Sequence, residues 1–401
     1  MNSLKRCIVS NSLLSSIFKE KRSSSSVRFL YSDQFLGIDK FIEARQRTTT
    51  RLGNMRGSFM ERMKLQVNSS MPAMVFTEDL KTVIHACEDK PEDIELCVQM
   101  MKKFHKQNSE LRFGTFVFGP VTMRLFHLMR KHELVASFSK DSDLKGFFDQ
   151  LKSYFLSMDL YFKSGMYKEV LEAFEELRGK QLADTKYPRD PLVLATAACY
   201  KINTPETFKI ATDLITGARE DGVHILRRAL IFTVSLALNQ NQPDIALEIL
   251  SSIDRFNNIT GNNLKLTAFA GLDRLQDAFD ILRRVTDQDS PVQTRIRGEV
   301  CQSSLDALQK SVERVNDKET SHIFEQLTRS LRESNLVSSQ TVDDLVCSPI
   351  EPRPPREGIF STSTRSPFPE QRFRGRERES FDNQSGFQER RRRFAGISDD
   401  F

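Results

Sequence analysis

Apolar residues recur at steps of three and four along residues 154–180, and this spacing predicts two amphipathic helices joined by a glycine. The apolar face of the first helix contains Tyr154, Phe155, Met158, Tyr161 and Phe162. Gly165 interrupts the run, because a residue without a Cβ can adopt the positive φ that a tight turn needs. The apolar face of the second helix contains Val170, Leu171, Phe174 and Leu177. One hairpin cannot bury both faces alone, so the pattern predicts that such hairpins repeat and stack.

The pattern of the second helix returns along the chain, clearly at 244–253 and 275–285 and more faintly at 92–101 and 207–215. Each unit has an anchor residue, usually small, where its two helices are expected to approach closely: Cys97, Ser137, Val170, Ala211, Ala246 and Ala278. These anchors lie 40, 33, 41, 35 and 32 residues apart, in the range of two-helix solenoid repeats. The chain is therefore predicted to be an all-α, right-handed solenoid of five to six helical hairpins. Its units are expected to begin near residues 77, 116, 152, 190, 227 and 262.

The residues of the clearest unit, 154–180, indicate the type of repeat more specifically than the spacing between units does. A first helix that ends in YFKSG, followed by MYKEVLEAFEEL, resembles the pentatricopeptide repeat, and the Trp-containing pattern of tetratricopeptide repeats is absent because the sequence has no Trp. The resemblance extends to FVFGPVTMRLF (116–126), LKGFFDQ (144–150), ACYKINTPETFKIATDL (198–214) and SLALNQNQPDIAL (235–247). Together these segments resemble the mitochondrial pentatricopeptide repeat domain-containing protein 2 family, over residues 75–290.

This resemblance implies an organellar protein that is needed for mitochondrial RNA maturation and, through it, for the respiratory chain. In the repeat pattern, a polar residue after the Tyr of each first helix hydrogen-bonds the edge of one base. The matching positions in this chain are Phe155, Leu194, Ile231 and Asn263. Only Asn263 carries hydrogen-bonding groups, so a code of one base per repeat is not expected.

Composition divides the chain into five parts. The predicted parts are a mitochondrial transit peptide (1–32), a basic N-terminal segment (33–76), the solenoid (77–290), C-terminal capping helices (291–347) and a disordered tail (348–401). The basic segment contains an amphipathic helix at 55–67. Capping helices are expected because an end repeat needs a polar outer face. The tail is rich in Pro, Arg, Ser and Gly without a period, and such a composition cannot bury enough apolar surface to fold alone.

The first thirty residues are typical of a mitochondrial transit peptide. They contain six basic residues, many serines and a single acid, Glu20. Several apolar residues can share one helix face, and the continuous apolar core of a secretory signal is missing. Import into the mitochondrial matrix is therefore expected, with cleavage at an undetermined bond between Arg28 and Asp33. The alternative is a plain disordered basic N-terminus.

Motifs and composition favour binding over catalysis. The net charge of +5 and the pI of about 8.8 are compatible with nucleic acid, and equally with matrix proteins in general. There is no phosphate-binding loop, nucleophile elbow or zinc-protease motif, and the six cysteines include no C-x-x-C. The acid pairs at 343–344 and 399–400 lack the further acids of a nuclease metal site. We expect no enzyme activity, metal, cofactor or small-molecule substrate, and the apolar runs are too short to span a membrane.

Single-stranded mitochondrial RNA is the expected ligand, with RNA-processing proteins as further candidate partners. Basic residues in the first helices, or at their ends, could track phosphates. The candidate contacts are Arg124, Lys152, Phe155, Lys163, Lys201, Arg227, Arg228, Asn263 and Lys265. For each cation the alternative is an ordinary solvated side chain, and the Arg-rich tail is either an RNA-touching arm or a solvated extension.

The competing interpretation of the whole chain is a non-catalytic protein-interaction scaffold in the matrix. Apolar residues at the base-reading positions favour it, because an apolar groove suits a partner helix or peptide as well as a base. A basic groove would favour RNA.

The leader hypothesis is testable by itself. A fluorescent reporter fused to residues 1–30 is expected to enter mitochondria, since basic charge, serine content and amphipathicity coincide there. Imaging of cells that express the fusion measures this directly. A diffuse cytosolic signal contradicts the prediction, and a fusion in which the six basic residues are replaced by Gln provides the control.

Overall fold

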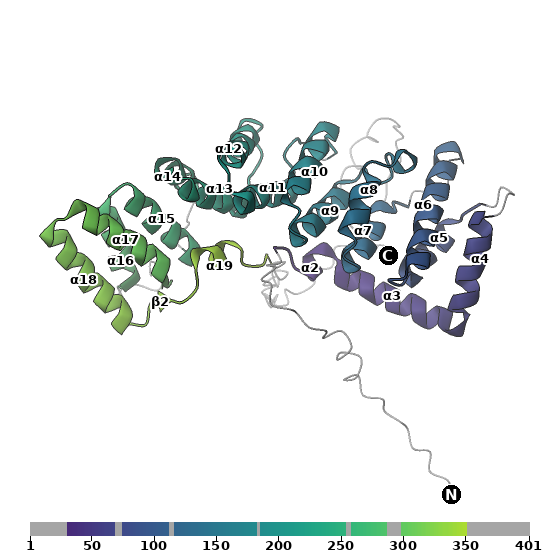
Figure 1. The fold of residues 1–401 in the computed structure, drawn as a ribbon, viewed down its shortest axis with the longest axis horizontal. Helices are drawn as coiled ribbons and strands as arrows, with labels where there is room; N and C mark the ends of the chain where they lie inside the picture. The colour runs from purple at the N-terminus through teal and green to yellow at the C-terminus, as the bar shows by residue number, and fades with distance from the viewer. Residues whose placement is uncertain are drawn as a thin grey trace, which may run out of the picture. The chain divides into compact units, whose positions relative to one another are not determined.

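The computed structural model describes residues 30–68, 74–111, 116–182, 185–253, 258–286 and 298–350. The described chain is almost entirely helical, apart from a short parallel pair of strands, β1 (Val300–Cys301) and β2 (Val337–Ser338). The predicted all-α solenoid of helical hairpins is therefore confirmed (Figure 1). The predicted leader up to residue 29 and the tail from residue 351 lie outside the described residues.

Six hairpins form the body of the fold. Their first helices are α5 (Thr77–Ala86), α7 (Gly119–Leu128), α9 (Leu151–Lys163), α11 (Arg189–Ile202), α13 (Arg227–Asn239) and α15 (Ile259–Gly271). Their second helices are α6 (Pro91–Leu111), α8 (His132–Phe138), α10 (Tyr167–Lys180), α12 (Pro205–Glu220), α14 (Pro243–Ser251) and α16 (Leu275–Thr286). Every first helix begins within three residues of its predicted start.

Further helices flank the hairpins. On the N-terminal side lie α2 (Asp33–Leu36), α3 (Ile38–Leu52), the 3-10 turn η1 (Gly53–Met55) and α4 (Arg56–Asn68). On the C-terminal side lie α17 (Gln302–Val315), α18 (Lys318–Glu333) and α19 (Val342–Val346). A second 3-10 turn, η2 (Ser142–Leu144), lies within the stack and follows α8. The helix predicted at 55–67 corresponds to α4, whereas α3 was not predicted.

The hairpins stack in two layers. Consecutive first helices contact one another from α9 through α11, α13 and α15 to α17, and each second helix packs on a first helix of its own or the next unit. The turns of five of the six described hairpins share one backbone feature, a residue with positive φ between the two helices. These residues are Arg130, Gly165, Asn203, Asn241 and Asp273. Glycine and asparagine adopt this left-handed conformation at low cost, which is why they end helices so often.

Five of the six predicted anchors are fully buried. Cys97, Val170, Ala211, Ala246 and Ala278 are each 0% exposed. The sixth was wrong: Ser137 is exposed, and Val135, two residues earlier, is buried. The anchors were chosen as the small residue of each second helix, but in α8, which has only 7 residues, Val135 and Phe138 occupy the buried face and Ser137 lies outside it.

The first helices in the middle of the stack are buried on every side. Residues 153–162 of α9, 191–199 of α11 and 229–237 of α13 are all buried without interruption. A helix that is apolar all round must be covered on all of its faces. The second helices cover only one side of this layer, so other parts of the chain must cover the opposite side.

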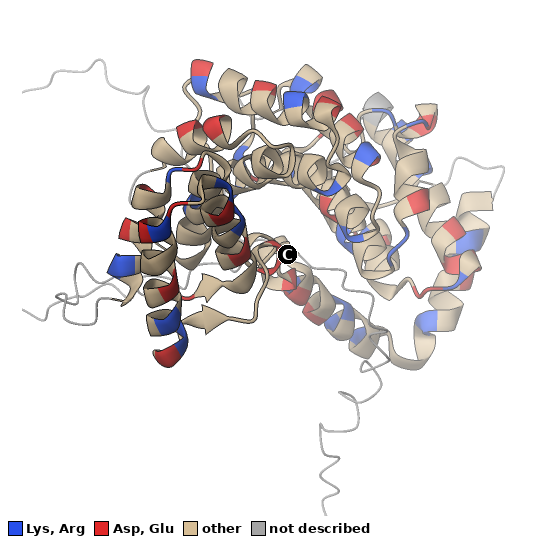
Figure 2. Cartoon of the chain, turned by 60° about the vertical axis from the view of Figure 1, so that its left-hand side comes forward, with Lys and Arg blue, Asp and Glu red and all other residues tan. Residues whose placement is uncertain are grey.

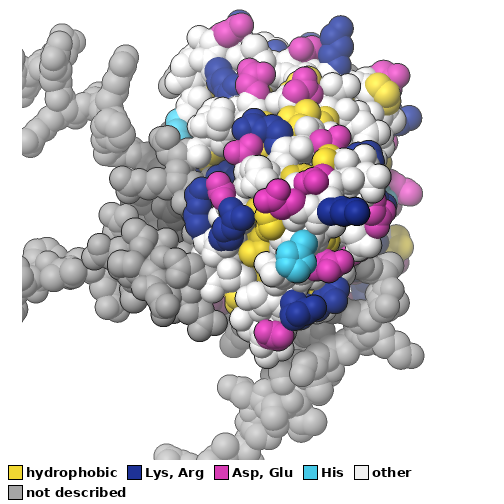
Figure 3. Space-filling model, turned by 90° about the vertical axis from the view of Figure 1, so that its left-hand side faces the viewer, with side chains coloured by type: hydrophobic (Ala, Val, Ile, Leu, Met, Phe, Trp, Pro, Cys, Tyr) yellow, Lys and Arg dark blue, Asp and Glu magenta, His cyan; other side chains and the backbone are white. Residues whose placement is uncertain are grey.

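The C-terminal end of the stack is closed by α17 and α18. The outward residues of α18 are charged or polar, and charged side chains surround smaller apolar areas on this end (Figure 3). Beneath them Phe324 and Leu331 are buried against Phe279 and Leu282 of α16. The arrangement has the polar outer face that a terminal repeat requires.

The anchors generate a test of the packing. Ala246→Trp and Ala278→Trp are each expected to lower the free energy of unfolding by about 1–3 kcal/mol or more, because a large ring would be forced between packed helices. Thermal unfolding of the purified protein measures this. Gln276→Trp, at an exposed position of the same helix as Ala278, is the matched control and is expected to be nearly neutral. An unchanged midpoint for both Ala variants contradicts the packing.

Candidate nucleic-acid interface

The chain covers its own first-helix layer on the side away from the second helices. Helix α3 packs against α5 and α7, while α19 packs against α13 and α15. Between these two helices, Leu30 and Tyr31 lie against the middle of the layer and are 2% and 1% exposed. The surface on which RNA contacts were predicted is therefore occupied by segments from both ends of the described chain.

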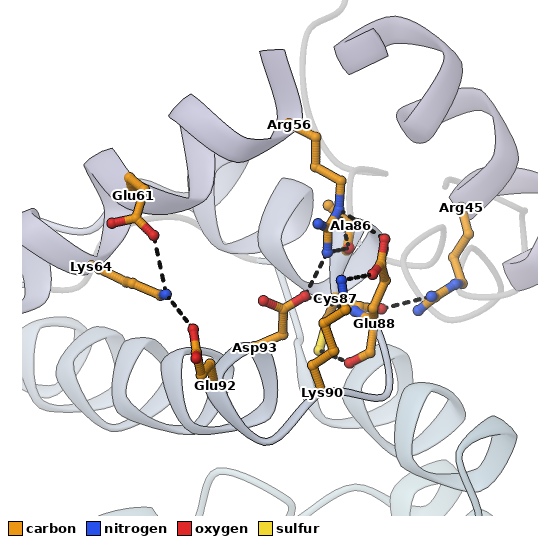
Figure 4. A network of polar contacts seen from close by, with 10 residues as sticks. All are labelled: Arg45, Arg56, Glu61, Lys64, Ala86, Cys87, Glu88, Lys90, Glu92 and Asp93. Carbon is orange, nitrogen blue, oxygen red and sulfur yellow. Dashed lines mark hydrogen bonds and ion pairs between the residues drawn. The ribbon is translucent and has the colours of Figure 1, made fainter. Parts of the chain in front are cut away.

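A polar network holds the N-terminal helices in place (Figure 4). The guanidinium of Arg56 donates hydrogen bonds to the carbonyl oxygen of Ala86 at 3.0 Å and to the carboxylate of Asp93. The same carboxylate oxygen accepts the backbone N–H of Glu88 at 3.1 Å. Arg45 donates to the carbonyl oxygen of Cys87 at 2.6 Å. Two arginines thus satisfy the carbonyl oxygens at the C-terminal end of α5, where helices leave such groups without partners.

An aromatic cluster lies over α9. The ring of Tyr31 meets Phe155 edge to face, with ring centroids 4.8 Å apart, and Phe35 of α2 packs on both rings. The Tyr31 hydroxyl donates to the carboxylate of Asp190 at 3.3 Å. The Nζ atom of Lys152 lies 4.8 Å from the centre of the Phe155 ring. Burial, together with the charge of nearby Arg124, lowers the pKa of Lys152, so this lysine is held in a poorly solvated position.

A buried cluster of ionisable side chains connects α7, α9 and α2. The Nε2 atom of His127 lies 2.8 Å from the carboxylate of Asp159, which is fully buried, and Lys163 lies 3.0 Å from the same oxygen. Lys163 also lies 3.6 Å from Asp33. His127 is therefore a core histidine with a carboxylate partner. Lys163 is only 10% exposed.

The C-terminal segment binds two of the predicted cations. Arg228 donates to the carbonyl oxygens of Leu345, Val346 and Ser348 at 3.3, 2.8 and 3.1 Å. Lys201 donates to the carboxylate of Asp343 at 3.0 Å. The end of this segment reaches the residues before α2, where the backbone N–H of Ile350 donates to the carbonyl oxygen of Leu30 at 2.7 Å.

The Lys201–Asp343 pair has a defined pH dependence. Burial by itself would raise the pKa of Asp343, but the hydrogen bonds from Lys201 and Tyr200 prevail and lower it. A carboxyl group with a lowered pKa stabilises the folded state above its ordinary pKa, and this contribution disappears as the pH falls through the lowered value. The pair therefore persists at neutral pH.

Asn263 stabilises the fold and is not exposed on a surface. Its amide donates to the carbonyl oxygen of Glu299 at 3.0 Å and its side-chain oxygen accepts the N–H of Cys301 at 2.7 Å. It is 0% exposed. The other base-reading positions, Phe155, Leu194 and Ile231, are 3%, 0% and 5% exposed. In this conformation none of the four presents its side chain to a base.

The remaining candidates differ in accessibility. Arg124 donates to the carbonyl oxygen of Leu36 at 3.2 Å. Lys265 is half-buried, and burial lowers its pKa, with the charge of Arg284 acting in the same direction. Arg227 is exposed at the start of α13. The structure thus brings Lys163 and Lys201 to one small hollow of about 290 Å³, while the other cations are distributed along the layer.

The charge of the described surface is mixed. Figure 2 shows Lys and Arg positions interspersed with Asp and Glu over the helices, without a large area of one sign. In the described ranges no three metal-ligating side chains gather into a group. Asp343 and Asp344 are used within the protein, since Asp344 caps α19. No helix in the part of the chain that the structure describes is long and apolar enough to cross a membrane.

Sequence reasoning missed the segments that cover the layer. Leu30 and Tyr31 were assigned to the leader, yet they are core residues, and Ser348 and Ile350 were assigned to the tail, yet they contact Arg228 and Leu30. The apolar spacing of Leu36, Ile38 and Phe41 was a signal for α2 and α3, because all three are buried. The five-residue α19 is too short to show a period.

Curated proteins named "Pentatricopeptide repeat-containing protein 2, mitochondrial" resemble this chain along most of its length. The Xenopus laevis protein is 26% identical over 328 residues, which cover 81% of this chain and 83% of that protein. The Homo sapiens protein is 30% identical over 260 residues, covering 65% and 66%. The Danio rerio protein is 29% identical over 322 residues, covering 80% and 81%.

This chain belongs to the mitochondrial pentatricopeptide repeat-containing protein 2 family. The resemblance noted in the sequence is thereby confirmed, and the name of the relatives agrees with the predicted mitochondrial leader. No family model matches the chain. The names of these relatives and the helical hairpins of the structure together indicate a helical-repeat mitochondrial protein.

The attachment of α19 to the first-helix layer can be tested by replacing each of two adjacent arginines. Arg228→Gln removes a charged donor to three carbonyl oxygens, and charged hydrogen bonds contribute about 1.5–3 kcal/mol. Hydrogen exchange of residues 342–350 is therefore expected to accelerate by at least tenfold. Arg227→Gln is the matched control, because Arg227 is exposed, and it is expected to leave exchange unchanged. Equal protection in both variants contradicts the attachment.

Proposed function

We propose that this protein is a mitochondrial RNA-binding factor that acts in the maturation, processing or stability of transcripts in the matrix, and so supports the respiratory chain indirectly. Its role is non-catalytic: it occupies a single-stranded segment and shields or shapes it for separate processing proteins. The helical-hairpin architecture and the family membership support this function, because such repeats present an extended surface to RNA.

One observation carries the proposal. Lys201 and Arg228, on the adjacent first helices α11 and α13, bind oxygen atoms of the chain's own C-terminal segment: one carboxylate, three carbonyl groups and the Ser348 hydroxyl. Arginine and lysine bind phosphate oxygens by the same kind of hydrogen bond. A ribose–phosphate backbone that replaced α19 would therefore meet two cations already positioned for oxygen ligands.

This mechanism predicts contact with phosphates rather than with base edges. Phe155, Leu194 and Ile231 have no hydrogen-bonding groups on their side chains, and Asn263 is engaged with Glu299 and Cys301. Affinity would then depend on salt and only weakly on sequence. It would also depend on how readily α19 leaves, since the segment and the RNA compete for the same two side chains.

The second candidate function is a protein-interaction scaffold. Burial of all four base-reading positions favours it, because a surface without base contacts has no evident means of choosing an RNA sequence. If the protein is such a scaffold, the experiment below would show no binding of single-stranded RNA to any variant.

Two substitutions at one ion pair test the RNA proposal. Lys201→Gln is expected to weaken binding to all single-stranded RNAs alike and to reduce the log–log salt slope by about 0.7. Asp343→Asn is expected to strengthen binding severalfold, because it loosens the competitor and keeps both cations. The measurement is affinity for a panel of labelled RNAs at several salt concentrations.

Opposite effects of the two substitutions on RNA affinity are the critical result. If Lys201 and Asp343 merely stabilised the fold, both substitutions would change binding in the same direction or not at all. Lys310→Gln, at an exposed position of α17, controls for the loss of one positive charge. Strong discrimination among RNA sequences that survives Lys201→Gln would contradict a phosphate-tracking mechanism.

A further inference from the structure

The second-helix layer is interrupted in the second hairpin. Helix α8 has 7 residues, whereas α6 before it has 21 and α10 after it has 14. Compared with α10, α8 is shorter by about two helical turns. The chain continues instead through η2 and an irregular segment to α9, and α8 lies between α6 and α10 (Figure 1).

A cleft of about 840 Å³ lies where the missing turns would be. Its walls come from α8, the segment 139–149, α9 and α10. The apolar part of the lining, here called the floor, includes Met123, Val135 and Phe138, with Met166 just before α10. This volume is within the range of about 300–1,000 Å³ that is typical of binding sites.

The cleft is lined by carboxylates that are not paired with cations in the described part of the chain. Glu133, Glu169 and Glu172 line it, and no ion pair among the described residues involves any of the three. By contrast, Glu176 and Asp149 at one end are both bound by Lys180 at 2.7 Å. The helical walls are thus acidic, and Lys140 and Lys145 come from the irregular segment.

A second feature of the cleft is independent of its charge. Tyr161 lines the cavity and is only 6% exposed, yet none of the hydrogen bonds within the described ranges uses its hydroxyl group. Burial and the nearby Glu169 and Glu176 raise the pKa of Tyr161, so the hydroxyl keeps its proton. The hydroxyl oxygen itself is not enclosed by the protein, so it opens into the cleft, where a ligand or water can hydrogen-bond it.

We propose that this cleft binds a short, basic, amphipathic helix of a partner protein, which completes the second-helix layer between α8 and α10. Apolar residues of the partner would cover the floor, and its Lys or Arg side chains would pair with Glu133, Glu169 and Glu172. The Tyr161 hydroxyl would hydrogen-bond the bound segment. A phosphate backbone is a poor occupant, because it would be repelled by these carboxylates, so the surface is separate from the proposed RNA face.

A synthetic probe tests the cleft on the full chain. The probe is a fluorescent 14-residue helix of Leu and Lys with the lysines on one face, and a matched peptide has Glu in place of Lys. Fluorescence anisotropy is expected to detect binding of the basic peptide only. A photoreactive group on the peptide is expected to crosslink to α8 or α10, as identified by mass spectrometry.

Variants separate the cleft from general charge attraction. The double reversal Glu169→Lys with Glu172→Lys is expected to weaken binding by more than about tenfold. The pair Glu220→Lys with Glu248→Lys makes the same change in net charge at exposed positions of α12 and α14, and is expected to preserve binding. Tyr161→Phe keeps the ring and removes the hydroxyl, and a severalfold loss is expected.

Several results would overturn the proposal. They are equal affinity for the basic and acidic peptides, equal loss in the two double variants, or crosslinks outside α8–α10. Thermal unfolding of each variant shows that it is folded, and a folded double reversal that binds as well as the wild type is decisive. None of these outcomes depends on whether the protein binds RNA.

Discussion

The burial of the first helices on all sides is the constraint on which the rest of this structure depends. Helices α9, α11 and α13 are uninterrupted runs of buried residues through their central turns. Exposure of such helices on one side would leave a broad apolar surface in water, which is unfavourable by about 25 cal/mol for each Å². The second helices cover one side, so the N-terminal helices and α19 must cover the other.

Covering this layer also determines what its charged side chains do. A cation that is removed from water needs oxygen partners, since an unpaired buried charge is costly. Lys163 meets Asp159, Lys201 meets Asp343, and Arg228 meets three carbonyl oxygens. Any ligand of this face must replace those oxygens as well as the segments that supply them. Binding and release of α19 are therefore linked by mass action.

The regularity of the stack is broken only locally. Most hairpins turn through a residue with positive φ and place a small residue between their helices, and α8 keeps the turn but loses half the helix length of α10. Because neighbouring hairpins continue unchanged, the shortened helix leaves a hollow instead of shifting the repeats. The molecule thus has two surfaces of different chemistry, one with cations held by oxygens and one with carboxylates beside a tyrosine hydroxyl.

The sequence by itself determined the helices of the six hairpins, their pairing, five of the six buried anchors and the family. These are local properties, because the spacing of apolar residues and a turn residue are contained within about 35 residues of chain. Only the tertiary structure decided which surface stays accessible. Tyr31 reaches Phe155 and Asp190, and Arg228 reaches residues more than a hundred positions further on. The spacing of apolar residues does not predict such contacts, because they depend on which apolar face packs against which distant segment.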